Sequence, residues 1–218
     1  MIRFFNGRIL CFSDGAVTVN DGEVWVDGVS VRENPLEAKR KLAYLPDNPD
    51  LYEYMTGIQY LNFIADVFGV DAQTRAERIA AYSEKFALTA DLAQPISAYS
   101  HGMKQKLAII SALMHKPKLL LMDEPFASLD FLTREELQSQ LLAVQAQMPR
   151  TILLVTHQLE EALLLGRRVI VMHPDSTIRE FDLSALPYPR DVEQPALRAL
   201  KAEITDECRK ASTGGIAE

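Results

Sequence analysis

Cysteine is scarce in this sequence, which has only Cys11 and Cys208 among its 218 residues. The two form neither a CxxC pair nor a disulfide framework, and neither has other metal-binding residues at close spacing, so we expect free thiols in a reducing compartment. Long apolar runs are also missing, since none reaches the roughly 18 residues of a membrane-spanning helix. Any membrane-spanning component is therefore expected to be another chain.

Basic residues are also fewer than acidic ones. The chain has 23 Lys and Arg residues against 30 Asp and Glu residues, a formal net charge of −7. This balance gives no general electrostatic affinity for nucleic acid, which is not expected as a partner. With 48% hydrophobic residues, the chain has enough apolar surface for one larger domain or for two lobes that share a core.

The segment LLLMDEPFASLD at 119–130 carries the strongest chemical signal. Its apolar run predicts a buried strand that ends in Asp123 and Glu124. A carboxylate in such a place can hold Mg²⁺ against nucleotide phosphates, and a neighbouring carboxylate can polarise an attacking water. An acidic pair that only meets a solvated loop explains these two residues alone equally well.

A second apolar run, TILLVT at 151–156, ends at His157. Parallel strands of one sheet bring their carboxyl ends to one crevice, so His157 is expected to face the same ligand. A lone histidine after a strand is, however, more often structural. The segment AYSHGMKQKLAIISALMHKPK at 98–118 then places Ser100 as an N-cap and Gly102 at the start of a helix. The amide groups at such a start bind phosphate.

Together these motifs resemble those of the ATP-binding cassette (ABC) ATPases. YSHGM at 99–103 is similar to the family's signature loop, LLLMDEP at 119–125 to Walker B, ASLD at 127–130 to the D-loop, and His157 to the switch histidine. The resemblance covers about residues 22–203. It implies an α/β fold in which a P-loop NTPase-like core sheet is flanked by helices, with a helical subdomain and an incomplete N-terminal part.

The direction of transport stays open at this point. YSHGMKQKL at 99–107 is similar to drug- and polysaccharide-type exporters, whereas MDEPFASLD at 122–130 and LPYPRD at 186–191 are more similar to nitrate, sulfonate and taurine importers.

The motif GxxxxGK[ST] occurs nowhere in the 218 residues. In that loop, backbone amides and a lysine clamp the phosphates and a hydroxyl ligates Mg²⁺. Because each such charge-assisted bond contributes about 1.5–3 kcal/mol, we expect nucleotide binding and hydrolysis by this chain alone to be weak.

The first residues suggest an explanation for the missing loop. MIRFFNG at 1–7 is similar to the middle of the helix that follows the P-loop lysine, which predicts an N-terminal truncation; a rebuilt N-terminus is the alternative. We also expect the strand at 119–122 to have lost a neighbour and to self-associate through its open edge. RILCF at 8–12 is a candidate replacement strand.

The predicted organisation is a single cassette. Residues 1–50 and 117–190 form the core lobe, 51–116 the helical lobe with the signature loop, and 191–218 a C-terminal helix and tail. Strands are predicted at 23–26, 29–31, 41–46, 168–173 and 177–181, and helices at 58–70, 72–86, 132–148, 158–165 and 191–208, followed by a disordered end at 211–218.

The resemblance also implies a role for each site residue. ATP with Mg²⁺ would lie between two cassettes, with Asp123 on the metal, Glu124 as general base and His157 on the γ-phosphate. Ser100 and Gly102 would close the site of the partner cassette.

Two further residues are implied as nucleotide contacts. Asp130 stands in the D-loop, and Asp47 stands where the family has its Q-loop glutamine. A solvated turn, DNPD at 47–50, is an equally good interpretation of Asp47.

The implied partners are transmembrane permease subunits and a second cassette, identical or different, with the chain peripheral at the cytoplasmic face of the membrane. Tyr52, Tyr54, Met55, Tyr60 and Phe63 crowd the region that would dock the permease; a helical core is the alternative. Two other functions stay open: a non-catalytic subunit that completes a partner's ATP site, and a soluble ABC protein of translation or repair. The absence of a basic patch disfavours the last.

Overall fold

The computed structural model describes residues 4–5, 11–13, 16–18, 23–173 and 177–213. The described residues divide into two compact units, one containing residues 23–155 and the other containing residues 4–5, 11–13, 16–18, 156–173 and 177–213. Each unit is described by itself. No helix in the described ranges combines the length and the apolar composition needed to cross a membrane.

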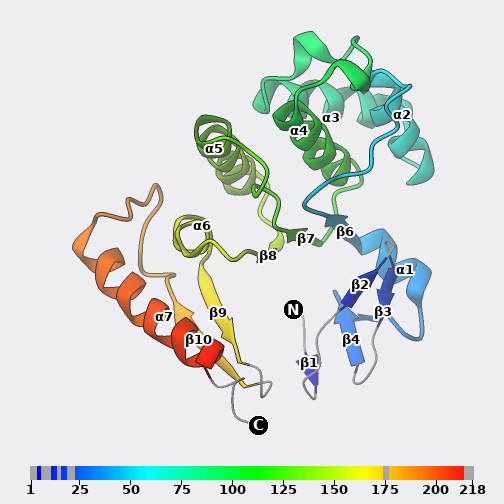
Figure 1. Ribbon diagram of the computed structural model, residues 1–218. Coiled ribbons are helices and arrows are strands. Elements are labelled where there is room, and N and C mark those ends of the chain that lie inside the picture. Colours follow the sequence, from blue (N-terminus) through cyan, green and yellow to red (C-terminus); the bar gives the residue numbers. More distant parts are fainter. Residues whose placement is uncertain (1–3, 6–10, 14–15, 19–22, 174–176, 214–218) are drawn as a thin grey trace. The chain divides into compact units, whose positions relative to one another are not determined.

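The first unit is built on a parallel sheet of three strands (Figure 1). In the order β6 (Leu42–Leu45), β7 (Leu119–Asp123), β8 (Thr151–Val155), the strand β7 is central and its first four residues are buried. Leu42 pairs with Leu119 on one side, and Leu119 pairs with Thr151 on the other. An apolar run buried on both faces is typical of a strand inside a parallel sheet.

This pairing corrects one expectation. The strand at 119–122 has no open edge, because β6 and β8 each supply a full ladder to it. Among the described residues, the edges of this sheet belong to β6 and β8. The prediction failed because apolar character marks a strand as buried but does not say which strands lie beside it.

Four of the helices described in this unit follow the predicted pattern closely. They are α2 (Gly57–Val67), α3 (Ala72–Lys85), α4 (His101–Leu113) and α5 (Phe131–Gln147). Figure 1 shows α2, α3 and α4 packed against one another, and α4 also contacts β6 and α5. Each helix begins at a residue whose side chain accepts a hydrogen bond from a backbone amide of the first turn: Thr56, Asp71, Ser100 and Asp130. Local capping chemistry thus fixes where each helix starts.

The helix α1 (Pro35–Lys41) was not predicted. Proline at its start has a φ angle suited to the first turn, and Lys39, Arg40 and Lys41 at its end suit the helix dipole. Ahead of it, β4 (Glu23–Val26) and β5 (Val29–Ser30) form the predicted antiparallel hairpin. Asp27 and Gly28 both have positive φ at its turn, the conformation that a two-residue hairpin requires. Two short 3₁₀ helices, Thr89–Asp91 and Ile96–Ala98, precede α4.

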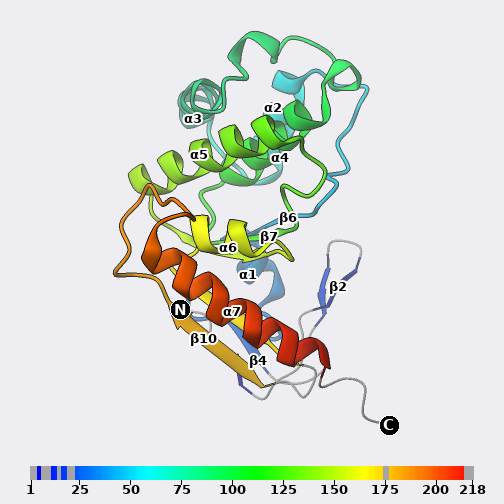
Figure 2. The same ribbon diagram turned by 60° about the vertical axis from the view of Figure 1, so that its left-hand side comes forward.

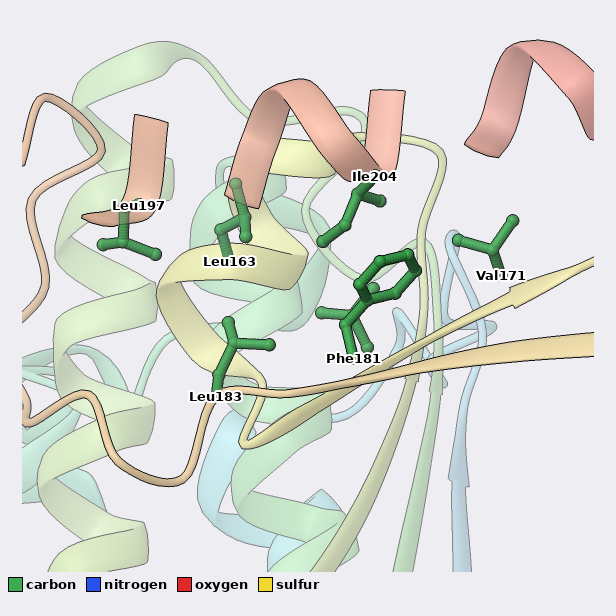
Figure 3. Packing of buried hydrophobic residues seen from close by; sticks show 7 residues of the cluster. Leu163, Val171, Phe181, Leu183, Leu197 and Ile204 are labelled. Carbon is green, nitrogen blue, oxygen red and sulfur yellow. The ribbon is translucent and has the colours of Figure 1, made fainter. Parts of the chain in front are cut away.

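The second unit contains α6 (Leu159–Leu165), the antiparallel pair β9 (Arg168–Met172) and β10 (Ile178–Asp182), and α7 (Pro195–Thr213). Figure 2 shows α7 running alongside β10, and it contacts β9 and α6. The buried cluster that joins these elements is shown in Figure 3 and consists of Leu163, Val169, Val171, Phe181, Leu183, Leu197 and Ile204.

A buried arginine links two segments of the second unit. Arg190, only 9% exposed, donates hydrogen bonds to the carbonyl oxygens of Leu163, Gly166, Leu183 and Leu186. These carbonyls belong to the end of α6 and to the loop after β10. One guanidinium therefore provides hydrogen bonds to four backbone carbonyls where the chain leaves regular secondary structure.

Two predictions at the chain ends need correction. Phe4 and Phe5 form the short strand β1 instead of part of a helix. Within RILCF, residues 8–10 lie outside the described residues, while β2 (Cys11–Ser13) pairs with β3 (Ala16–Thr18). The helix α7 continues through Thr213, so residues 211–213 are helical and the predicted end at Cys208 is too early. Residues 214–218 lie outside the described residues.

Candidate functional site

The end of β7 presents Asp123 and Glu124 side by side, both half-buried. Glu124 has a φ of 47°, a left-handed conformation that is rare for a residue with a side chain. Its backbone amide donates to the carbonyl of Val155 at 2.9 Å, and its carbonyl accepts from the amide of Ala127 at 3.1 Å. The chain therefore turns sharply as it leaves the strand, and this strained conformation is fixed from both sides.

The end of the neighbouring strand β6 adds Tyr44 and Asp47. The hydroxyl of Tyr44 donates to Asp123 Oδ2 at 3.4 Å. Asp47 is exposed, and its Oδ1 accepts from the backbone amide of Asn48 at 2.8 Å. The chain bends at Asp47 and Asn48, while a contact of Asp47 with nucleotide stays a prediction. Burial raises the pKa of the Tyr44 hydroxyl, and the negative charges of Asp123 and Asp47 raise it further.

These oxygen donors suit Mg²⁺. The ion prefers oxygen ligands and is usually held through one or two carboxylates together with the phosphates of a substrate. Within the described residues there is no group of three or more His, Cys, Asp or Glu side chains that could hold a metal ion. The carboxylates of Asp123 and Glu124 are of the kind that hold Mg²⁺ together with a bound phosphate.

The predicted helix start at Ser100 is formed as expected, while phosphate binding there stays a prediction. Ser100 is the N-cap of α4, and its exposed side chain accepts from the amide of Met103 at 3.2 Å. Gly102 is buried against α5, because a Cβ atom at this position would lie 2.6 Å from Cγ2 of Thr133. The first turn of α4 thus abuts the first turn of α5, and a side chain at position 102 would clash with Thr133 unless one of them shifts.

Asp130 caps that first turn of α5. Its carboxylate accepts from the amide of Thr133 at 3.1 Å, and hydrogen bonding with Thr133 lowers the pKa of Asp130. The structure therefore brings Gly102, Thr133 and Asp130 together. It gives Asp130 a capping role, and its predicted contact with nucleotide stays a prediction.

His157 lies two residues after the end of β8 and is exposed. It belongs to the second unit. The neighbouring Thr156 donates to Glu161 Oε2 at 2.8 Å and accepts from the amide of Gln158 at 3.0 Å. These bonds order the loop that leads into α6. The predicted part of His157 in the nucleotide site stays a prediction.

Sequence reasoning missed Tyr44 and Thr133. Tyr44 lies in a strand of mostly apolar residues. Its hydroxyl was the one signal that could have distinguished it from its apolar neighbours. Thr133 gave no signal, because its contact with Gly102 joins two helices that lie about thirty residues apart along the chain.

Comparison with known proteins agrees with these features. Residues 11–127 match the family model described as "ABC transporter". An uncharacterized ABC transporter ATP-binding protein of Haemophilus influenzae is 34% identical over 176 residues, which cover 78% of this chain and 72% of the relative. The choline transport ATP-binding protein OpuBA of Bacillus subtilis is 31% identical over 156 residues, 69% of this chain but only 40% of that protein.

A solved structure of an ATP-binding subunit of an ABC transporter has 28% sequence identity and a TM-score of 0.67, and the match covers 85% of this chain and 77% of that one. The α/β core sheet flanked by helices is therefore the fold of ABC ATPases, as the sequence motifs implied. The chain belongs to the ABC transporter family of ATP-binding proteins.

Proposed function

We propose that this chain is the ATP-binding, energy-coupling subunit of an ABC membrane transporter. The observation that carries the proposal is the pair Asp123 and Glu124 at the end of the central strand. The backbone turns sharply at Glu124, where the loop begins. In a P-loop NTPase, carboxylates placed in this way serve the metal and the attacking water. The match to transporter ATP-binding proteins supports the same function.

In this proposal Asp123 holds Mg²⁺, and Glu124 accepts the proton of the attacking water. The bound ion supplies positive charge that offsets the charge of the β- and γ-phosphates. His157 donates to the γ-phosphate. Asp47 and Asp130 line the nucleotide from the ends of β6 and the β7–α5 loop, in addition to their contacts in the turn and the helix cap.

Ser100 and Gly102 act on a second cassette, identical or different. Ser100 is exposed at the start of α4, and helix starts bind phosphate through their backbone amides, so this start would meet the phosphates of a nucleotide held by the partner. Each cassette would then complete the site of the other.

The permease is proposed to dock on an aromatic surface of the helical lobe. Tyr54 is 80% exposed and Tyr52 43% exposed, whereas Tyr60 is almost fully buried. The ring of Tyr52 stacks on that of Tyr54 with centroids 5.8 Å apart and meets the edge of Phe63 at 5.5 Å. Tyr60 thus anchors the cluster in the core, and the other three rings form a surface of the kind favoured at protein interfaces. This surface would hold the chain at the cytoplasmic face of the membrane.

The alternative function is that of a non-catalytic subunit. It differs from the first in that ATP is hydrolysed at the partner's site and not at the site of this chain. Since GxxxxGK[ST] is absent from the 218 residues, this chain would complete the ATP site of a partner that has the loop, and its own carboxylates would not turn over ATP. This second form is the alternative to the first; hydrolysis by this chain alone is expected to be weak in both, and the following assay separates them.

The test is the ATPase rate of a mixed complex with a P-loop-containing cassette. Ser100→Arg is expected to abolish the activity, because its bulk fills the phosphate position, whereas Ser97→Arg on the exposed turn before α4 is the matched control and should not. Glu124→Gln in this chain should leave the rate unchanged. A loss of two or more orders of magnitude, the scale of a lost general base, would show that this chain's own site is catalytic.

A further inference from the structure

The tyrosine at the end of β6 lies on the same face of the sheet as Asp123. Tyr44 pairs in register with Leu121, and Leu121 and Asp123 are two residues apart on β7. Because side chains alternate between the two faces of a strand, residues 44, 121 and 123 share one face. The long side chain of Tyr44 spans the remaining distance, so that its hydroxyl lies 3.4 Å from Asp123 Oδ2.

The hydroxyl of Tyr44 is a hydrogen-bond donor to the Asp123 carboxylate. The side chain is half-buried at the end of β6, and its hydroxyl donates to Asp123 Oδ2. A donor held on Oδ2 restricts the rotation of this carboxylate and leaves its other oxygen for a metal ion.

We propose that Tyr44 is a positioning residue, whose hydroxyl orients the Asp123 carboxylate for binding a divalent metal ion. This inference rests on the proposed function in one respect, which is that Asp123 is taken as the residue that binds the metal. Groups that orient a metal ligand typically change metal affinity about 10–100-fold when they are removed. Because 3.4 Å is longer than the usual O–H···O distance, we expect the lower end of this range.

The test uses Mn²⁺ alone as the probe, with the full chain and no nucleotide. Paramagnetic broadening of the backbone amide NMR signals of residues 123–127 reports where the ion binds, even at millimolar affinity. Asp123→Asn should abolish the broadening, and Tyr44→Phe should raise the Mn²⁺ concentration for half-maximal broadening about 10-fold. Tyr82→Phe is the matched control, because it removes the hydroxyl of a buried tyrosine whose contact is with Met148.

A second measurement separates positioning from structural damage. In the mixed complex, Tyr44→Phe should raise the Mg²⁺ concentration for half-maximal ATPase activity if the carboxylates of this chain serve a working site, with little change in the maximal rate. The same Mn²⁺ response in wild type and Tyr44→Phe, or the absence of Mn²⁺ broadening in the wild type, would overturn the inference. A shifted Mn²⁺ response in a complex without ATPase activity would sustain the inference and count against the proposed function.

Discussion

The contact between Gly102 and Thr133 predicts that even one methyl group at position 102 is harmful. A Cβ atom there would lie 2.6 Å from Cγ2 of Thr133, and 3.9 Å from Cδ2 of Leu129, which is an ordinary contact. Thr133 cannot turn away easily, because a β-branched side chain has few rotamers in a helix. Its backbone is also held by the cap from Asp130.

The magnitude follows from two opposing effects. Forcing an extra methyl group into packed surroundings costs about 1–3 kcal/mol, while replacing glycine by alanine in a helix gains at most about 1 kcal/mol. Gly102→Ala should therefore lower the free energy of unfolding by up to about 2 kcal/mol. Thr133→Ser removes Cγ2 and costs about 1 kcal/mol of buried methyl, but in the double variant it removes the clash as well.

Urea unfolding of the wild type, the two single variants and the double variant measures this coupling. We expect the double variant to be more stable than the sum of the single effects by about 1–3 kcal/mol. The trans-activation of a partner cassette should fall in Gly102→Ala and recover in the double variant, because the same contact positions the start of α4. A fully stable Gly102→Ala protein, or coupling near zero, would refute this account of the contact.

Two further predictions concern stability. Arg190→Met should lower the free energy of unfolding by about 3–5 kcal/mol, since it leaves several buried carbonyls without their charged donor; the exposed Arg198→Met is the control, and equal stability of the two variants would contradict the role of Arg190. Burial lowers the pKa of His115, which stacks on Phe68 with ring centroids 3.8 Å apart. The unfolded chain therefore takes up a proton at this residue first, and stability should decline as pH falls below the ordinary histidine value near 6.5. His115→Phe keeps a stacking ring and should lose this part of the pH dependence in urea unfolding at pH 5 to 8; identical profiles for the two proteins would contradict the assignment.

The elements that carry the motifs were predictable because their signals are local. The helix α4 has an N-cap at Ser100 and apolar residues at helical spacing, and the central strand is a continuous apolar run that leads to two carboxylates. Both depend on residues within one or two turns of each other. The weak short helix α1 was missed because its exposed Leu36 and buried Ala38 give hardly any apolar pattern.

The sequence by itself determined the family, the buried strand that leads to Asp123 and Glu124, and the start of α4 at Ser100. Only the tertiary structure decided that β7 is paired on both sides, that Thr133 lies against Gly102, and that the Tyr44 hydroxyl reaches Asp123. Each of these depends on strand register or on the approach of two helices. The physical reason is that register and close approach are set by packing between segments far apart in the chain, which local composition does not encode.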